Sequence, residues 1–263
     1  MSRISRTVGA LALLALIGAG VAWAVLSGDG SDQTTTASIP RAAAPRAAHE
    51  RPRAAQEKPR LQLANRGQPI VSLRHGARIP IRTSPGGKVI KTLRWRTPFD
   101  SRTVLAVFRH HGKWAGVPTP LLPNGQLGWV KLDPSRLRSG WTRYTVDIDL
   151  SKRAAQLRDG NRVLRSFTVT VGAPGTSTPT GRFAVTDTFR GNLGPAYGCC
   201  ALATTATQPH LPSGWFGGDR IAIHGTYGPL GIADSHGCVR AANENVNLLV
   251  NRVPLGSPVV IRQ

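Results

Sequence analysis

The sequence predicts a mainly β protein, in which a small antiparallel β-barrel is followed by a larger β-rich domain with one packed helix and one long loop. Three observations support this fold class. Between residues 67 and 133, short apolar runs alternate with turns that contain Gly or Pro. Residues 143–171 hold two strand-like runs around the hairpin signal Asp159-Gly160. Residues 243–253 are the one segment in which apolar residues recur at helical spacing and a proline, Pro254, follows, which predicts a single helix.

The first 66 residues are expected to lie outside any folded core. Arg3 and Arg6 precede residues 8–26, an unbroken apolar or small-residue run that is long enough to cross a bilayer. We expect a membrane anchor with residues 1–7 in the cytoplasm, and the alternative is a signal peptide removed after Ala24. Residues 27–66 are rich in Ala, Pro and Arg and predict a disordered linker.

The chain carries a formal net charge of +21. A nucleic-acid partner is not expected, because no helix-turn-helix, RNA-binding or zinc-finger pattern accompanies the charge. A basic surface also suits an exported protein that works against acidic wall polymers or anionic lipids. The location expected is therefore the extracytoplasmic face of the cell membrane or the cell wall, anchored by a single pass, or secreted if the signal is cleaved.

Residues 67–133 predict the barrel, and residues 134–140 are expected to form a short connector to the second domain. The barrel ends in two strands that each contain a tryptophan, Trp114 and Trp129. Together with Trp95, these side chains are expected to belong to the core.

The second domain, residues 142–263, is predicted to begin as a β-meander and to end in a helix and a strand. Residues 188–219 lack a strand pattern and predict a long loop that acts as a lid or substrate channel. The adjacent Cys199 and Cys200 lie in this loop, and the sequence leaves open whether they are two free thiols or a disulfide.

Cysteine and histidine near the C-terminus form the candidate active site. An apolar run leads to His224, and the turn Ser235-His236-Gly237-Cys238 presents a thiol ahead of the helix. A thiolate is the nucleophile in acyl transfer through a thioester, and an imidazole can act as its base. A glycine at position 237 allows a tight turn, in which the amides of Gly237 and Cys238 could stabilise an oxyanion. His224, His236 and Cys238 lack the fourth ligand of a zinc site, so no metal is expected.

The ordered set His224 and Ser235-His236-Gly237-Cys238-Val239-Arg240 resembles the signature of the L,D-transpeptidases of bacterial peptidoglycan. Residues 172–186 and 218–224 are similar to the same family, and the resemblance covers residues 142–263. The paired tryptophan strands of the barrel resemble bacterial Src-homology-3-like domains, which implies a module that binds wall components or packs on a catalytic partner.

The resemblance implies an acyltransferase that crosslinks peptidoglycan stem peptides through a thioester on Cys238, with His224 as the base. It also implies that His236, Gly237 and Ser235 support the pocket, that Arg240 and Tyr227 contact substrate, and that some β-lactams acylate the thiol. No cofactor is implied, and a monomer is expected.

Other functions remain open at the level of the sequence. An L,D-carboxypeptidase would trim the same stems, and a catalytically silent protein would only bind the wall. A zinc hydrolase would lose turnover on chelation. A papain-type peptidase is disfavoured, because His224 precedes Cys238 in the chain and papain-type enzymes have the reverse order.

Overall fold

The computed structural model of the chain describes residues 67–215 and 218–263. The predicted cytoplasmic N-terminus (1–7), membrane segment (8–26) and linker (27–66) lie outside the described residues. Within the described part, no helix combines the length and the apolar character that a membrane crossing requires. The expectations for the first 66 residues therefore stay predictions.

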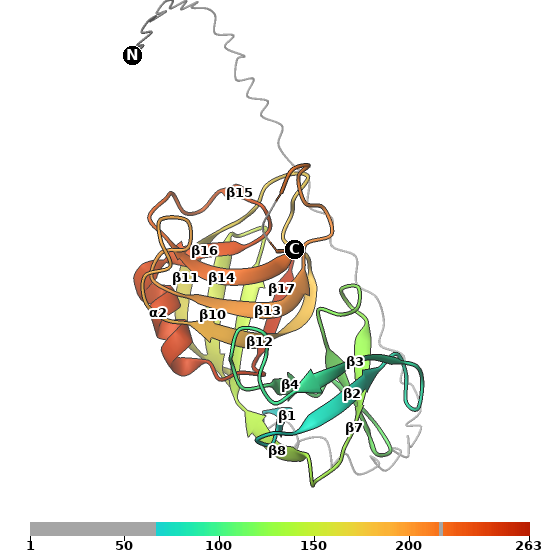
Figure 1. Cartoon of the computed structure of the whole chain (residues 1–263). Coiled ribbons are helices and arrows are strands. Elements are labelled where there is room, and N and C mark those ends of the chain that lie inside the picture. The colour runs from blue at the N-terminus through green and yellow to red at the C-terminus, as the bar shows by residue number, and fades with distance from the viewer. Residues whose placement is uncertain (1–66, 216–217) are drawn as a thin grey trace, which may run out of the picture. The chain divides into compact units, whose positions relative to one another are not determined.

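Residues 67–142 form two antiparallel sheets around one core (Figure 1). The five-stranded sheet follows the order β3 (Val89–Arg94), β2 (Arg78–Arg82), β7 (Leu127–Lys131), β6 (Trp114–Pro118), β5 (Arg109–His111). The three-stranded sheet follows the order β4 (Val104–Ala106), β1 (Gln68–Leu73), β8 (Leu137–Thr142). Leu73, Ile81, Val117 and Val130 are fully buried between them. The mainly β character is confirmed, and the Src-homology-3-like identity stays a prediction.

The connector predicted at residues 134–140 is wrong for its second half, because strand β8 begins at Leu137. This strand pairs with the whole of β1, from Gln68↔Thr142 to Leu73↔Leu137. Only the two end residues of β8 are buried. The strand therefore lacks the alternation of apolar and polar residues by which a half-buried strand is detected in sequence.

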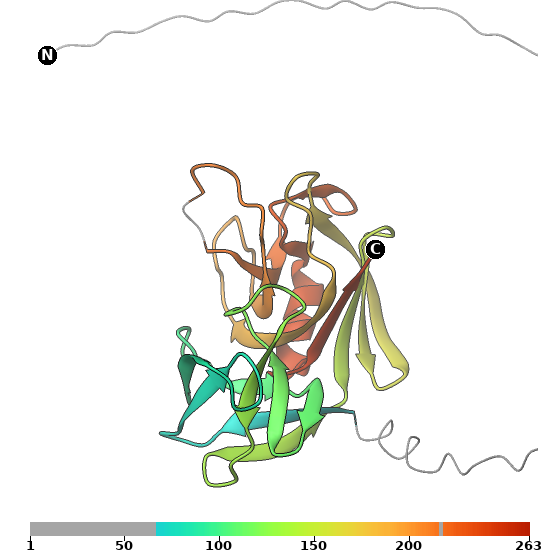
Figure 2. The same ribbon diagram turned by 90° about the vertical axis from the view of Figure 1, so that its right-hand side faces the viewer.

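The second part is a nine-stranded sheet that returns to its first strand. Its order is β10 (Ala154–Asp159), β9 (Tyr144–Asp149), β17 (Pro258–Arg262), β12 (Gly181–Phe189), β13 (Ala201–Thr207), β14 (Arg220–Thr226), β16 (Val239–Ala242), β11 (Arg162–Gly172), β15 (Ala233–Ser235). Residues 162–168 of β11 pair with β10, and residues 169–172 pair with β16 and β15. The sheet thereby closes on itself, as Figure 2 lets the reader follow from the side.

The predicted helix is confirmed as α2 (Asn243–Arg252), the one helix among the described residues. Its Val246, Leu249 and Val250 are at most 3% exposed and belong to the core of the nine-stranded sheet. The helix packs against β13, β14 and β16. It ends before Pro254, which cannot supply the N–H that a further helical turn needs.

The loop predicted over residues 188–219 is shorter than expected, because β13 divides it in two. Residues 201–206 of this strand are all buried. Since β13 lies between β12 and β14 and is covered on both faces, its sequence shows no alternation, and its small Ala and Thr side chains resemble those of a loop. Two separate described segments, residues 190–200 and 208–215, remain as loops near the candidate site.

Candidate active site

Parallel pairing of strands β14 and β16 brings His224 and Cys238 close together in the fold. The two strands are parallel neighbours, with Ile223 opposite Val239 and His224 opposite Arg240. Ile223 and Val239 are at most 1% exposed and point into the core. Because side chains alternate along a strand, His224 points to the opposite face from Ile223. Cys238 directly precedes β16, so its backbone lies beside the same stretch of β14 that carries the imidazole.

Cys238 is the free cysteine of the described residues, and backbone groups of β14 surround its sulfur. The Ala222 N–H donates to Sγ at 3.4 Å, and the thiol faces the carbonyl of Arg220 at 3.9 Å. Burial raises the pKa of the Cys238 thiol, while the Ala222 amide and the nearby Arg240 charge lower it to a smaller extent. The resting site therefore holds a protonated thiol at neutral pH.

His224 is 3% exposed and is held by its own strand. Its Nδ1 lies 2.8 Å from the carbonyl oxygen of Gly225. Because a carbonyl can only accept, Nδ1 carries the proton and Nε2 is left as the basic nitrogen. Burial lowers the pKa of His224, and Arg240 lowers it further, against the opposing effect of the Gly225 carbonyl. The imidazole is thus neutral at neutral pH and can accept a proton.

The turn that precedes Cys238 is fixed by hydrogen bonds from three directions. Ser235 Oγ donates to the Cys238 carbonyl and accepts the Gly237 N–H at 3.1 Å. Thr178 Oγ1 donates to the Gly237 carbonyl at 2.8 Å, and Gln208 Nε2 donates to the His236 carbonyl at 3.1 Å. Position 237 requires glycine, since its φ is +110° and a Cβ there would lie 2.2 Å from Gln208 Nε2.

These contacts bear on the predicted roles of the turn. Ser235 bonds within the turn, as its position suggests. The Gly237 amide is already bound to Ser235, so an oxyanion could use it only if that bond were broken. The oxyanion role of the Cys238 amide stays a prediction.

Aromatic side chains from the two loops contact the two histidines. Tyr197 packs edge-on against the ring of His224, with 4.9 Å between centroids. Trp215 contacts the ring of His236, also at 4.9 Å. The sequence placed both aromatic residues in the loop but did not indicate which histidine each one meets. Tyr227 is 72% exposed, and its predicted substrate contact stays a prediction.

Arg240 lies opposite His224 and is half-buried. Its Nη1 is 3.4 Å from a carboxylate oxygen of Asp234, whose side chain is 63% exposed. An exposed pair of this kind holds a guanidinium only weakly. Arg240 is therefore free to meet a substrate carboxylate, and this role too stays a prediction.

Cys199 and Cys200 form a disulfide with each other, which decides between the two alternatives that the sequence left open. Neither cysteine is therefore available to bridge Cys238. The Cys200 carbonyl accepts the Gly225 N–H at 3.0 Å, next to His224. This hydrogen bond, not the disulfide, joins the end of the loop carrying Tyr197 to the strand that carries the imidazole.

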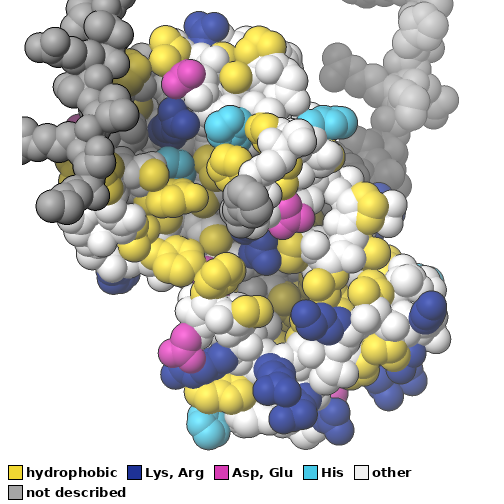
Figure 3. Space-filling model, turned by 45° about the horizontal axis from the view of Figure 1, so that its top comes forward, with side chains coloured by type: hydrophobic (Ala, Val, Ile, Leu, Met, Phe, Trp, Pro, Cys, Tyr) yellow, Lys and Arg dark blue, Asp and Glu magenta, His cyan; other side chains and the backbone are white. Residues whose placement is uncertain are grey.

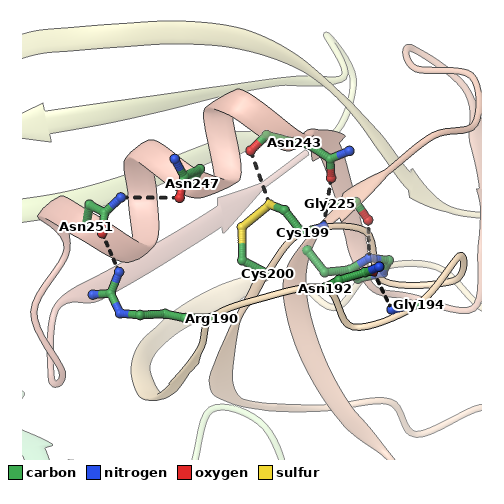
Figure 4. Close-up of a disulfide and its surroundings, with 10 residues drawn as sticks. Arg190, Asn192, Gly194, Cys199, Cys200, Gly225, Asn243, Asn247 and Asn251 are labelled. Carbon is green, nitrogen blue, oxygen red and sulfur yellow. Dashed lines mark hydrogen bonds between the residues drawn. A yellow bond between two sulfur atoms is a disulfide. The ribbon is translucent and has the colours of Figure 1, made fainter.

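Asn243 is a residue near the site whose role the sequence did not indicate. It is the first residue of α2, whose N-cap is Ala242, and no side chain caps the helix there. The Asn243 side-chain oxygen instead accepts the Cys199 N–H at 3.0 Å (Figure 4). It is packed against both Gly198 and Gly225, where an added Cβ would lie within 2.3 Å of it. The side chain therefore fastens the loop to β14 beside His224.

We expect Gly225→Ala to lower the free energy of unfolding by about 1–3 kcal/mol, as overpacking does in buried sites. The new methyl group would lie 2.1 Å from Asn243 Oδ1 and 3.0 Å from the Cys199 nitrogen. Gly228→Ala is the matched control, because its Cβ would meet only Thr226 Oγ1 at 3.4 Å. Denaturant unfolding of both variants measures the difference, and equal stabilities would show that the Asn243 contact is not tight.

Within residues 67–215 and 218–263, no three His, Cys, Asp or Glu side chains come together as metal ligands. The candidate site consists of the thiol of Cys238, the neutral imidazole of His224 and the guanidinium of Arg240. Backbone amides and two aromatic side chains complete its walls.

The fold and the site together define a class: a β-sheet domain that presents a free thiol and a neutral histidine from neighbouring parallel strands. Residues 143–261 match the family model of the L,D-transpeptidase catalytic domain. This segment of the chain belongs to that family.

Two curated relatives and several solved structures are similar to the chain. Over 122 residues it is 30% identical to YkuD of Bacillus subtilis (strain 168), and over 120 residues 29% identical to YkuD of Bacillus licheniformis, both named as L,D-transpeptidases. The matches cover 46% and 45% of this chain, and the chain spans 66% and 65% of the two relatives.

Among solved structures, an L,D-transpeptidase from Mycobacterium smegmatis is 16% identical, with a TM-score of 0.37 over 52% of this chain and 73% of that one. L,D-transpeptidase 3 from Mycobacterium tuberculosis, solved with a faropenem-derived adduct, is also 16% identical, with a TM-score of 0.38 over 52% and 73%.

Proposed function

We propose that this protein crosslinks peptidoglycan by L,D-transpeptidation and that Cys238 carries the acyl group as a thioester. The observation that supports the proposal is that β14, which carries the neutral imidazole, pairs in parallel with β16, which the free thiol of Cys238 directly precedes. The family match of residues 143–261 supplies the reaction class.

In the first half-reaction, Cys238 Sγ attacks the carbonyl carbon that precedes the terminal D-amino acid of a donor stem peptide. His224 Nε2 accepts the thiol proton as the S–C bond forms. The C–N bond to the D-amino acid then breaks, and the proton passes from His224 to the departing amine. The product is a thioester and a free D-amino acid.

In the second half-reaction, the amine of an acceptor stem attacks the thioester. His224 removes a proton from the amine and returns it to the sulfur as the C–S bond breaks, which releases the crosslinked peptide. Attack by water instead would yield a trimmed stem. The resting site suits these reaction steps, because the thiol of Cys238 and the imidazole of His224 both begin neutral. No charged pair has to be stabilised before substrate arrives.

Further parts of the proposal follow from the sequence. Residues 8–26 would anchor the chain, or export it if cleaved, so that the catalytic domain works outside the cytoplasm. Acylation of Cys238 by a β-lactam would use the same attack on a carbonyl and would leave the thiol blocked. Neither step requires a cofactor.

The test of this function is mass spectrometry of a disaccharide-tetrapeptide incubated with the full chain. We expect a crosslinked dimer that has lost one D-amino acid. Trimmed monomers without dimer would establish a carboxypeptidase instead, and unchanged substrate would contradict both activities.

Alkylation tests the protonation state of the nucleophile. Because burial raises the pKa of Cys238, we expect its reaction with iodoacetamide to reach half of its maximal rate above the ordinary thiol value of about 8.5. Arg240→Gln removes the nearby positive charge and should raise the pH of half-maximal alkylation still further. A rate that is already maximal at neutral pH would show a resting thiolate and contradict the neutral pair.

A further inference from the structure

A surface groove that is lined by neither Cys238 nor His224 lies between the first sheets and the nine-stranded sheet, which belong to one compact unit of the chain. Its cavity volume is about 750 Å³. We call it the edge groove and define it by Lys91, Arg94, Trp95, Leu105, Thr186 and Arg220. A volume of this size accommodates several residues of an extended peptide rather than a single ion.

Two strand edges form one wall of the edge groove. β3 is the outer strand of the five-stranded sheet, and β4 is the outer strand of the three-stranded sheet. The groove is lined by consecutive residues of both segments, 91–98 and 103–106. Because successive side chains point to opposite faces, a cavity over one face would meet only every second residue. The groove therefore runs along the edges, and the outer edge of β3 lacks a neighbouring strand.

One end of the groove is closed by hydrogen bonds between the two segments. The Thr103 N–H donates to the Trp95 carbonyl at 2.8 Å, and Thr103 Oγ1 donates to the Arg94 carbonyl at 2.7 Å. Among the described residues, no strand pairs with the outer edge of β3 before Arg94. An added strand could therefore bond to the edge over residues 89–93.

The charge of the groove favours an anionic occupant. Five cationic side chains line it, against one acidic side chain, Asp187. Asp187 is 1% exposed, accepts a hydrogen bond from Thr97 and lies 4.0 Å from Arg220, so it is already neutralised. Arg96 pairs with Asp100 at 3.1 Å, whereas Lys91 and Arg94 have no acidic side chain within 4 Å in the described part of the chain. Figure 3 shows that Lys and Arg side chains gather on the lower part of the face that it presents.

Arg220 connects the groove with the catalytic strand. Its guanidinium lies in the groove, where Nη1 donates to Thr186 Oγ1 and to the Thr204 carbonyl, each at 3.0 Å. Its own carbonyl faces Cys238 Sγ at 3.9 Å. Arg220 therefore contributes its side chain to the groove and its carbonyl to the surroundings of the nucleophile.

We propose that the edge groove binds an extended peptide that carries free carboxylates, added as a strand to the edge of β3. Main-chain bonds to β3 would give affinity, and Lys91 and Arg94 would select carboxylates. Resting on the proposed function, the occupant is a stem peptide of the wall other than the one that reacts. The groove would then hold a neighbouring part of the polymer while Cys238 turns over its substrate.

The test measures binding with the active site blocked. The full chain is alkylated at Cys238 with iodoacetamide, which leaves the Cys199–Cys200 disulfide unmodified. A fluorescent stem tetrapeptide with free carboxylates is titrated, and its anisotropy gives the Kd. We expect binding to survive alkylation and to weaken tenfold or more when the carboxylates are amidated.

Matched double variants locate the site. Lys91→Glu with Arg94→Glu changes the charge inside the groove, and we expect a Kd at least tenfold weaker. Lys113→Glu with Arg138→Glu makes the same change of net charge at exposed positions outside the groove lining, and we expect less than a twofold effect.

Three results would overturn the groove proposal: equal affinity of the two double variants, loss of binding on alkylation, or equally tight binding of the peptide-free disaccharide. Failure of the proposed function would be seen separately, as the absence of crosslinked product from the unmodified chain. The two proposals can therefore fail independently.

Discussion

Cys238→Ala is expected to abolish crosslinking, with a loss of at least about 10³-fold in kcat, because the thioester cannot form without the sulfur. In the described residues no other free cysteine can replace it, since Cys199 and Cys200 are bridged. Product analysis by mass spectrometry measures the loss, and thermal unfolding checks that the fold is kept.

Cys238→Ser provides a stricter form of the same test. A serine hydroxyl has nearly the same shape but is a far weaker acid than a thiol, and a neutral imidazole alone activates it less well. We expect this variant to be as inactive as Cys238→Ala. Dimer formation by either variant would show that another group carries the acyl transfer.

His224→Gln is expected to lower kcat/KM by about 10²–10⁴-fold, the usual contribution of a general base. Glutamine can still bond to the Gly225 carbonyl through its amide but cannot accept a proton. His210→Gln is the control, because this exposed histidine is bonded to Gln208 only through its backbone N–H. An equal effect of both substitutions would contradict the role of His224.

The pH profile separates a base from a merely structural residue. Since burial lowers the pKa of His224, the unprotonated base persists below the ordinary value of about 6.5. Activity of the native chain should therefore fall only at a pH below that value, and the residual activity of His224→Gln should lack this fall. A fall in activity at or above pH 6.5, or a fall that His224→Gln retains, would contradict the role of His224 as the base.

The sequence predicted those parts of the site that strands and turns impose locally. The apolar run that ends in His224 is β14, the Ser-His-Gly-Cys turn leads directly into β16, and the helical spacing after it is α2. Parallel pairing of β14 with β16 then brings Cys238, the residue before β16, beside the strand that carries His224. A sequence shows which residues share a strand, but it does not show which strands become neighbours.

The features that could not be predicted depend on distant contacts. Strand β13 has no alternation because neighbouring strands cover it, and β8 is a strand because β1 needs a partner. The role of Asn243 arises from the Cys199 amide, which the fold brings beside it from another loop. In each case tertiary packing overrides the local pattern.

The most direct measurement is the intact mass of the full chain, quenched while it turns over a disaccharide-tetrapeptide. We predict a population whose mass is increased by the donor stem minus its terminal D-amino acid. Peptide mapping should place this acyl group on Cys238, and the adduct should be absent from Cys238→Ala. Crosslinked product without such an adduct, or an adduct on any other residue, would contradict the assignment of Cys238 as the acyl carrier.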